Sequence, residues 1–203
     1  MIARFWDVDE GQILIGNENI KNYTINDLMS NISMVFQKVY LFEDTIENNI
    51  KFGQPDVNLE AVIAASKKAQ CHEFISKLPN GYKTIVGEGG ASLSGGEKQR
   101  ISIARAILKN APIIIFDEAT ANIDPENEDK LRLAIESLTE NKTVIMIAHR
   151  LKTIRNAEQI LVLNKGKIEQ RGTHDELMNK GGLYRNLVNA KMMSEKWGFK
   201  MNV

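Results

Sequence analysis

Short hydrophobic runs alternate with longer amphipathic stretches along this chain. Four runs have the length of β-strands and end at turn or polar residues: Gln12–Ile15, Ile32–Phe36, Pro112–Phe116 and Thr143–Ile147. The third is continuously apolar and rich in β-branched residues, which is typical of a parallel strand buried on both faces. The fourth has the same character, so both are expected inside a parallel sheet.

The stretches between these runs carry helical signals. From Glu43 to Lys77 the apolar positions repeat with helical spacing, and Asn58 is a suitable N-cap within this stretch. Further helices are predicted at Gly96–Lys109, Pro125–Leu138 and Leu183–Met193. Strands that alternate with helices predict an α/β layered fold.

The C-terminal third carries two local signals. Asn164-Lys165-Gly166 lies between the segments Glu158–Leu163 and Lys167–Gln170, which predicts a β-hairpin. Thr173, with Glu176 at the third helical position, predicts a short helix with a capping box.

Composition narrows the class of protein without indicating a function. The 203 residues, 43% of them hydrophobic, suit one compact globular domain. The 26 basic and 26 acidic residues cancel, so no polybasic field points to nucleic acid. The single cysteine, Cys71, is expected to be a small buried hydrophobe.

No segment predicts a membrane span or a signal peptide. The longest apolar stretches, Ala111–Phe116 and Val144–Ala148, are far shorter than the ~20 residues that a spanning helix needs. The N-terminus, Met1–Asp7, lacks a long apolar segment and reaches acidic residues quickly. Any membrane connection is therefore expected through a partner.

The strongest chemical signal is Leu93-Ser94-Gly95-Gly96-Glu97-Lys98-Gln99-Arg100. Ser94 is a good helix cap, and the two glycines let a phosphate approach backbone N–H groups at the N-terminus of a helix. The helix dipole adds partial positive charge there. For Ser-Gly-Gly by itself, an ordinary capped helix is an equal alternative.

A second signal is the pair Asp117-Glu118 at the end of the third hydrophobic run. Parallel α/β sheets bind ligands at the carboxyl ends of their strands. In a phosphate site one carboxylate can organise Mg²⁺ while the other orients or deprotonates water. The alternative is that the pair caps the next helix. Gln37 and His149 also follow strands directly, and each alone is more typical of a surface or structural residue.

Together these segments resemble the ATPase domain of ABC transporters, and the resemblance covers the whole chain. Segment 93–100 is similar to the ABC signature motif, and 113–120 to a Walker B motif followed by the catalytic glutamate. The other matches are Gln37 to the Q-loop glutamine, His149 to the switch histidine and Asp124 to the D-loop, where Ala121 replaces the more usual serine.

The resemblance implies ATP and Mg²⁺ as cofactors and a role for each matched residue. Asp117 and Gln37 would serve Mg²⁺, Glu118 would be the general base, and His149 would hold the γ-phosphate and the attacking water. Gln37 would also report nucleotide occupancy to the membrane domain. The residues expected at the nucleotide of the opposite subunit or its interface are Ser94, Gly95, Gly96, Gln99 and Asp124.

Two further stretches, Leu41–Ile50 and Thr84–Gly89, look like those of ABC exporters. In that group the second stretch faces the coupling helices of the transmembrane domains. The implied partners are such domains and a second ATPase domain, with no nucleic acid, at the cytoplasmic face of the cell membrane. The interval from Gln37 to Ser94 has no sustained heptads, which disfavours the DNA-repair ATPases of the same superfamily.

A Walker A P-loop, Gly-x-x-x-x-Gly-Lys-Ser/Thr, is absent from the sequence. Gly166-Lys167 is the only Gly-Lys pair, but Ile168 follows it and Leu161 stands at the first glycine position. The resemblance implies that the chain starts just past the phosphate cradle. The strand leading to the P-loop is then expected beside the Asp117 strand, and its loss should leave an unpaired apolar edge. We therefore expect the isolated chain to hydrolyse ATP very weakly and to be poorly soluble.

The predicted fold is a P-loop NTPase-like α/β fold with a parallel-sheet core, missing the N-terminal strands and the P-loop. A partial ATPase domain is expected over 1–203, with a helical signature subdomain at about 43–100 and the Walker B, D-loop, switch-histidine and C-terminal segments at 101–203. Two functions stay open: an incomplete exporter ATPase, and a non-catalytic module that completes a partner's ATP site. An unrelated phosphatase or nuclease using Asp117 and Glu118 leaves segment 94–100 unexplained.

Overall fold

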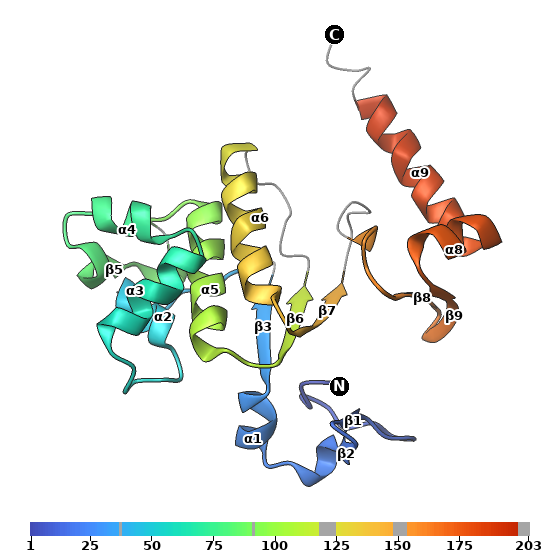
Figure 1. The fold of residues 1–203 in the computed structure, drawn as a ribbon, viewed down its shortest axis with the longest axis horizontal. Helices are drawn as coiled ribbons and strands as arrows, with labels where there is room; N and C mark the ends of the chain where they lie inside the picture. Colours follow the sequence, from blue (N-terminus) through green and yellow to red (C-terminus); the bar gives the residue numbers. More distant parts are fainter. Residues whose placement is uncertain (37, 91, 118–124, 148–153, 199–203) are drawn as a thin grey trace. The chain divides into compact units, whose positions relative to one another are not determined.

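A three-stranded parallel sheet organises the first of the two units of the chain. The structure is a computed structural model that describes residues 1–36, 38–90, 92–117, 125–147 and 154–198. The units are Met1–Ile147 and Ala148–Val203. The sheet has the order β3-β6-β7, formed by β3 (Ile32–Phe36), β6 (Ile113–Asp117) and β7 (Thr143–Ile147). The strands predicted from the hydrophobic runs are therefore confirmed (Figure 1).

Alternation along the strands sends side chains into two cores. On β6, Ile114 and Phe116 are fully buried in the larger core, which helices complete on one face of the sheet. Ile115 faces a smaller core on the other side, together with Ile20 and Leu28 of the N-terminal segment. The central strand is thus covered on both faces, as its unbroken apolar run predicts.

The prediction that an additional strand would lie beside the Asp117 strand is wrong. β6 is paired along its whole length on both sides, and Asp117 lies opposite Phe36 of β3 and Ile147 of β7. The outer edges of the sheet belong to β3 and β7, and neither pairs with a further strand within the described ranges. Val144 and Ile147 of β7 are 38% and 53% exposed. A fourth strand would therefore pair with β3 or β7, because the central strand has no free edge.

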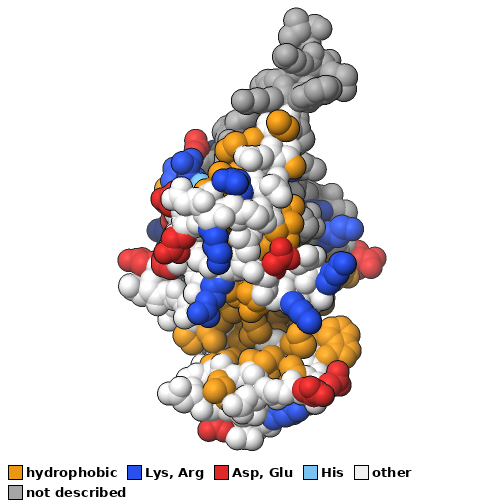
Figure 2. All heavy atoms as spheres, turned by 90° about the vertical axis from the view of Figure 1, so that its right-hand side faces the viewer, with side chains coloured by type: hydrophobic (Ala, Val, Ile, Leu, Met, Phe, Trp, Pro, Cys, Tyr) orange, Lys and Arg blue, Asp and Glu red, His pale blue; other side chains and the backbone are white. Residues whose placement is uncertain are grey.

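Helices and short strands complete the first unit. A hairpin of β1 (Leu14–Ile15) and β2 (Glu18–Asn19) leads to α1 (Ile25–Ser30), and β4 (Asp44–Thr45) pairs with β5 (Ile85–Val86). The helices of the larger core are α2 (Ile46–Lys51), α3 (Leu59–Lys68), α4 (His72–Lys77), α5 (Gly95–Lys109) and α6 (Pro125–Thr139). In Figure 2, hydrophobic side chains reach the surface in the lower part of the view, where Figure 1 places β1, β2 and α1.

Local capping explains where the longer helices begin. The Asn58 side chain accepts from the Ala61 N–H at 2.9 Å, so α3 starts at the predicted cap. α5 starts after Ser94 and ends at Asn110, which adopts the left-handed conformation typical of a helix C-terminus. Cys71 is buried immediately before α4, and burial raises the pKa of its thiol to about 12. The thiol is therefore an inert packing group, as predicted.

The second unit has a small core of its own. The hairpin of β8 (Ile160–Asn164) and β9 (Lys167–Gly172) is followed by α8 (His174–Lys180) and α9 (Leu183–Gly198). Ile160, Val162 and Leu177 pack against α9 residues. The buried Gln170 side chain donates to the Gly181 carbonyl and accepts from the Tyr184 N–H. The predicted hairpin and the Thr173 cap are confirmed. Within the described ranges no helix combines the length and apolar character needed to cross a membrane.

Candidate functional site

The first turn of α5 carries the candidate phosphate-binding residues. Ser94 is the N-cap, and its Oγ accepts from the Glu97 N–H at 3.4 Å. The Glu97 carboxylate in turn accepts from the Ser94 N–H at 2.9 Å and from the Ser94 hydroxyl at 2.8 Å. This reciprocal capping box holds the turn in one conformation before any ligand arrives.

Two backbone donors at the start of α5 lack a hydrogen-bond partner in the described part of the chain, and one of them belongs to an exposed residue. The N–H groups of Gly95 and Gly96 have no hydrogen-bond partner among the described residues. Ser94 and Gly95 are exposed, whereas Gly96 is buried, and a side chain added at Gly95 would meet nothing within 4 Å. Unpaired N–H groups at the positive end of a 15-residue helix suit a phosphate oxygen. The turn therefore fits the phosphate end of a nucleotide.

Two neighbours modify that fit. The Glu97 carboxylate lies at the same turn and places a negative charge beside an incoming phosphate. Gln99 is only 5% exposed, and its buried Nε2 has no hydrogen-bond partner in the part of the chain that the structure describes. A nucleotide at Ser94 and Gly95 would not touch the Gln99 side chain without a local rearrangement.

Asp117 lies at the carboxyl end of β6. Side chains two residues apart share a face of a strand, so Asp117 follows Ile115 onto the face of the smaller core. α5 packs in the larger core on the opposite face. No hydrogen bond or ion pair joins Ser94 to Asp117 in the described part of the chain. One chain thus presents these two residues to different sides of its sheet.

Four other predicted site residues, Gln37, Glu118, Asp124 and His149, lie outside the described residues. Within the described ranges, no group of three or more His, Cys, Asp or Glu side chains could hold a metal ion. Asp117 is therefore the one predicted Mg²⁺ ligand that the structure places.

The two stretches predicted from exporters lie side by side, because β4 pairs with β5. Asp44 lies opposite Val86, and Thr45 opposite Ile85, which is 68% exposed. Next to β4 is an aromatic cluster formed by Tyr40, Phe42 and Phe52. The Phe42 and Phe52 rings stack at 4.8 Å, and Tyr40 meets Phe42 edge-on at 5.3 Å. The sequence analysis singled out the two stretches, but it predicted neither their pairing nor this exposed cluster.

Comparison with known proteins identifies the family. The family model described as ABC transporter matches residues 1–121, which is more than half of the chain. The chain belongs to the ABC transporter family.

Individual relatives point to exporters within that family. The chain is 50% identical over 192 residues to the ATP-dependent lipid A-core flippase of Haemophilus ducreyi, covering 94% of this chain and 33% of the relative. It is 44% identical over 196 residues to the uncharacterized ABC transporter ATP-binding protein YknU of Bacillus subtilis, covering 97% and 34%. A solved bacterial Atm1-family ABC exporter with ATP bound matches with a TM-score of 0.86 and 42% identity, over 94% of this chain and 33% of the other.

The chain spans about a third of the length of these relatives. The fold is that of an ABC exporter ATP-binding domain, with α/β architecture around a parallel sheet. This confirms the predicted family and fold class. α5 begins in the segment that resembles the ABC signature motif, and it is called the signature helix below.

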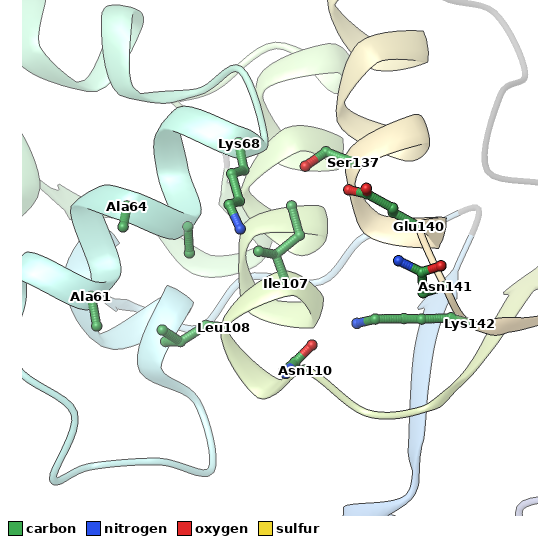
Figure 3. Close-up of a pocket in the computed structure, with 11 residues that line it drawn as sticks. Ala61, Ala64, Lys68, Ile107, Leu108, Asn110, Ser137, Glu140, Asn141 and Lys142 are labelled. Atoms are coloured by element: carbon green, nitrogen blue, oxygen red, sulfur yellow. The ribbon is translucent and has the colours of Figure 1, made fainter.

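A pocket of about 490 Å³ at the far end of the signature helix contains none of the predicted site residues. It lies between α3, α5 and α6, and Figure 3 shows Lys68 and Lys142 extending from its two sides. The C-terminal ends of all three helices meet here, and their partial negative charge favours lysines over a polyphosphate. Burial, followed by the charge of Lys68, lowers the pKa of Lys142. The pocket is therefore unsuited to nucleotide, in contrast to the first turn of the same helix.

Proposed function

We propose that this chain is part of an exporter ATP-binding domain that couples ATP hydrolysis to transport through transmembrane partner domains at the cytoplasmic face of the cell membrane. The first turn of the signature helix then contacts ATP held by a second ATP-binding domain. The observation that carries this proposal is the exposed, pre-capped turn at Ser94, with the unpaired N–H groups of Gly95 and Gly96.

The sheet geometry supports a site shared between two subunits. Ser94 belongs to the helix layer, whereas Asp117 projects on the opposite face at the strand end. A phosphate at Ser94 and a metal at Asp117 of the same chain would lie on different sides of the sheet. A second domain that brings its own phosphate cradle to Ser94 removes this conflict.

Bound ATP with Mg²⁺ would supply a phosphoryl group for transfer and a metal that neutralises its charge. At a nucleotide bound beside Asp117, Asp117 and Gln37 would hold the metal, Glu118 would accept a proton from water, and His149 would position that water. At the nucleotide held by the second domain, Ser94, Gly95 and Gly96 would donate to phosphate oxygens, and Asp124 would lie at the interface between the two domains. Gln99 is buried, so it would reach the nucleotide only after a local rearrangement.

The transmembrane side is proposed at the paired exporter stretches. The β4–β5 pair with the exposed Ile85, and the aromatic cluster of Tyr40, Phe42 and Phe52, offer an apolar surface. Exposed aromatic groups of this kind are common at protein interfaces. The helical subdomain is proposed at about 43–100 and the Walker B, D-loop, switch-histidine and C-terminal segments at 101–203.

A second candidate function is a non-catalytic module that lends its signature turn to a partner's ATP site. The observation that favours it is that Ser94, Gly95 and Gly96 are preorganised by the capping box alone. In that case Glu118 of this chain has no role in hydrolysis, because the partner supplies the general base.

The two functions are separated by ATPase measurements on this chain combined with a P-loop-bearing ATP-binding domain. For the catalytic proposal we expect Glu118→Gln and His149→Ala each to lower turnover at least about 100-fold, and Glu118→Gln to accumulate nucleotide-bound dimers. Normal turnover in both variants, with loss only on changing Ser94, would select the binding module. No stimulation by the wild-type chain in any combination would refute both.

A further inference from the structure

A side chain of the signature helix contacts the C-terminal end of the short helix α2. A helix leaves its last carbonyl groups without partners inside the helix, and these need partners from elsewhere. In α2 the Lys51 carbonyl accepts from the Gln54 N–H at 2.6 Å. The Asn49 carbonyl accepts from Nε of Arg105 at 2.8 Å, across 56 residues of sequence. Arg105 of α5 therefore caps the C-terminal end of α2.

The Asn49 side chain extends this contact to the segment before α2. Asn49 is buried, and its Nδ2 donates to the carbonyls of Phe42 at 3.0 Å and Thr45 at 3.1 Å. Its Oδ1 accepts from the Phe42 N–H at 2.9 Å and lies 3.5 Å from Nη2 of Arg105. The backbone of Phe42 is thus fixed on both its donor and its acceptor by one side chain that Arg105 contacts.

Arg105 also touches the aromatic cluster directly. Its guanidinium carbon lies 5.2 Å from the centre of the Phe52 ring, within the range of a cation–π contact. No carboxylate pairs with Arg105 within the described residues, and burial lowers the pKa of its guanidinium. A half-buried cation without a carboxylate is costly unless its donors are used. Its planar fork serves a carbonyl, an amide oxygen and a ring face at once, which a lysine cannot do.

We propose that Arg105 is a positioning residue that fastens the aromatic cluster of Tyr40, Phe42 and Phe52 to the signature helix. Arg105 lies about 16 Å along the helix from Ser94, at about 1.5 Å per residue. The helix is continuous between them, so a displacement of its first turn moves the end of α2 and the cluster with it. The consequence for coupling to transmembrane domains rests on the proposed function, whereas the mechanical link does not.

The link is tested on the 203-residue chain by amide hydrogen exchange, with the thermal midpoint recorded alongside. Arg105→Leu should raise exchange at Phe42, Ile50 and Lys51 at least about tenfold relative to α6. Arg105→Lys should give an intermediate increase, since it keeps a cation near Phe52 but loses the fork. The matched control is Arg132→Leu, because Arg132 is an exposed arginine of α6 with ion pairs to Asp129 and Glu136.

A double-mutant cycle separates a specific link from general loss of stability. Arg105→Lys and Phe52→Ala should give less than additive increases in exchange at Phe42, because each removes part of the same contact. Unchanged exchange in Arg105→Leu, or a uniform rise throughout Met1–Ile147, would overturn the proposal. If Arg105→Leu does not fold, Arg105→Lys and the cycle decide in the same way.

A second arm tests the role in coupling. In an assembly of this chain with a P-loop-bearing domain and transmembrane domains, Arg105→Lys should leave KM for ATP within about twofold. The stimulation of kcat by the transmembrane domains should fall at least about fivefold, because the Ser94 end is untouched while the cluster loosens. Normal stimulation would overturn the positioning role. An inactive wild-type assembly would refute the proposed function alone, and the exchange measurements would still decide the link.

Discussion

Two helices of this chain, α5 in the first unit and α8 in the second, begin with the same local device and differ in the residues of their first turns. In α5 Ser94 and Glu97 form a capping box, with the Glu97 carboxylate 2.9 Å from the Ser94 nitrogen. In α8 Thr173 and Glu176 form the same box at 2.8 Å. Each box satisfies one donor in the helix and one before it.

The next two residues separate a candidate site from a structural cap. α5 continues with Gly95-Gly96, whose backbone N–H groups have no partner among the described residues, and Gly95 is exposed with open space around it. α8 continues with His174-Asp175; Nδ1 of His174 contacts the Tyr184 hydroxyl at 2.8 Å, and Asp175 adds a negative charge to the first turn. A capping box alone therefore says nothing about anion binding. The residues at the first two helical positions decide whether the helix dipole is available.

The largest expected effect comes from filling the open turn. Ser94→Arg places a long side chain over the Gly95 and Gly96 N–H groups and removes the cap. In the mixture with a P-loop-bearing domain, ATPase stimulation should fall at least about 100-fold, the scale of losing preorganised donors at a reacting phosphate. Thr173→Arg, the matched change in α8, should leave stimulation within about twofold. Equal losses in both variants would show that the cap acts only through stability.

A smaller effect is expected at Gly95, where an added methyl group fits sterically but interferes with phosphate binding. An added methyl group meets no atom within 4 Å, so Gly95→Ala should leave the free energy of unfolding unchanged or raise it by up to about 1 kcal/mol. The same methyl group stands between a phosphate and the N–H, so ATPase stimulation should fall about tenfold, or about 1.4 kcal/mol of transition-state binding. Denaturant unfolding and turnover on one preparation test both.

The comparison position in the second unit is Gly172, next to the α8 cap. A methyl group there would lie 2.8 Å from Oε2 of Glu176, the atom that accepts from the Thr173 N–H. Gly172→Ala should therefore break the capping box and cost about 1 kcal/mol of stability, with no change in ATPase stimulation. A stable Gly172→Ala protein would mean that the Glu176 side chain has another favourable position.

Local patterns predicted most of the fold. Ile32–Phe36 and Thr143–Ile147 form strands with the expected limits, and the hairpin at Lys165-Gly166 and the caps at Asn58 and Thr173 also agree. These features depend on neighbours in sequence, through strand hydrophobicity and side-chain capping. The order of the strands in the sheet depends instead on contacts between residues far apart in the sequence. The wrong prediction of a strand beside Asp117 concerned this order.

Sequence patterns likewise predicted only part of the candidate site. The Ser94-x-x-Glu97 spacing already indicates a capping box, but the similarity to the signature motif assigned a role to the glycines and none to Glu97. Burial of Gln99 depends on which side of α5 packs on the sheet. The contacts from Arg105 to Asn49 and Phe52 join segments 56 residues apart or nearly so, and no periodic signal in the sequence marks them.

The smallest expected effect comes from removing the negative charge from each of the two capping boxes. Glu97→Gln and Glu176→Gln each keep an oxygen that can accept from the cap N–H, and each removes a charge that interacts with the helix dipole. Both should lose about 0.3–1 kcal/mol of stability. Only Glu97 lies beside the proposed phosphate, so Glu97→Gln should also tighten the apparent ATP affinity of the combined domains about two- to fivefold, because a repulsive charge is gone. Titration of nucleotide at fixed ionic strength measures this, and Glu176→Gln is the control. Weaker ATP affinity in Glu97→Gln would mean that the carboxylate holds Ser94 in its binding position, and that preorganisation outweighs repulsion at this turn.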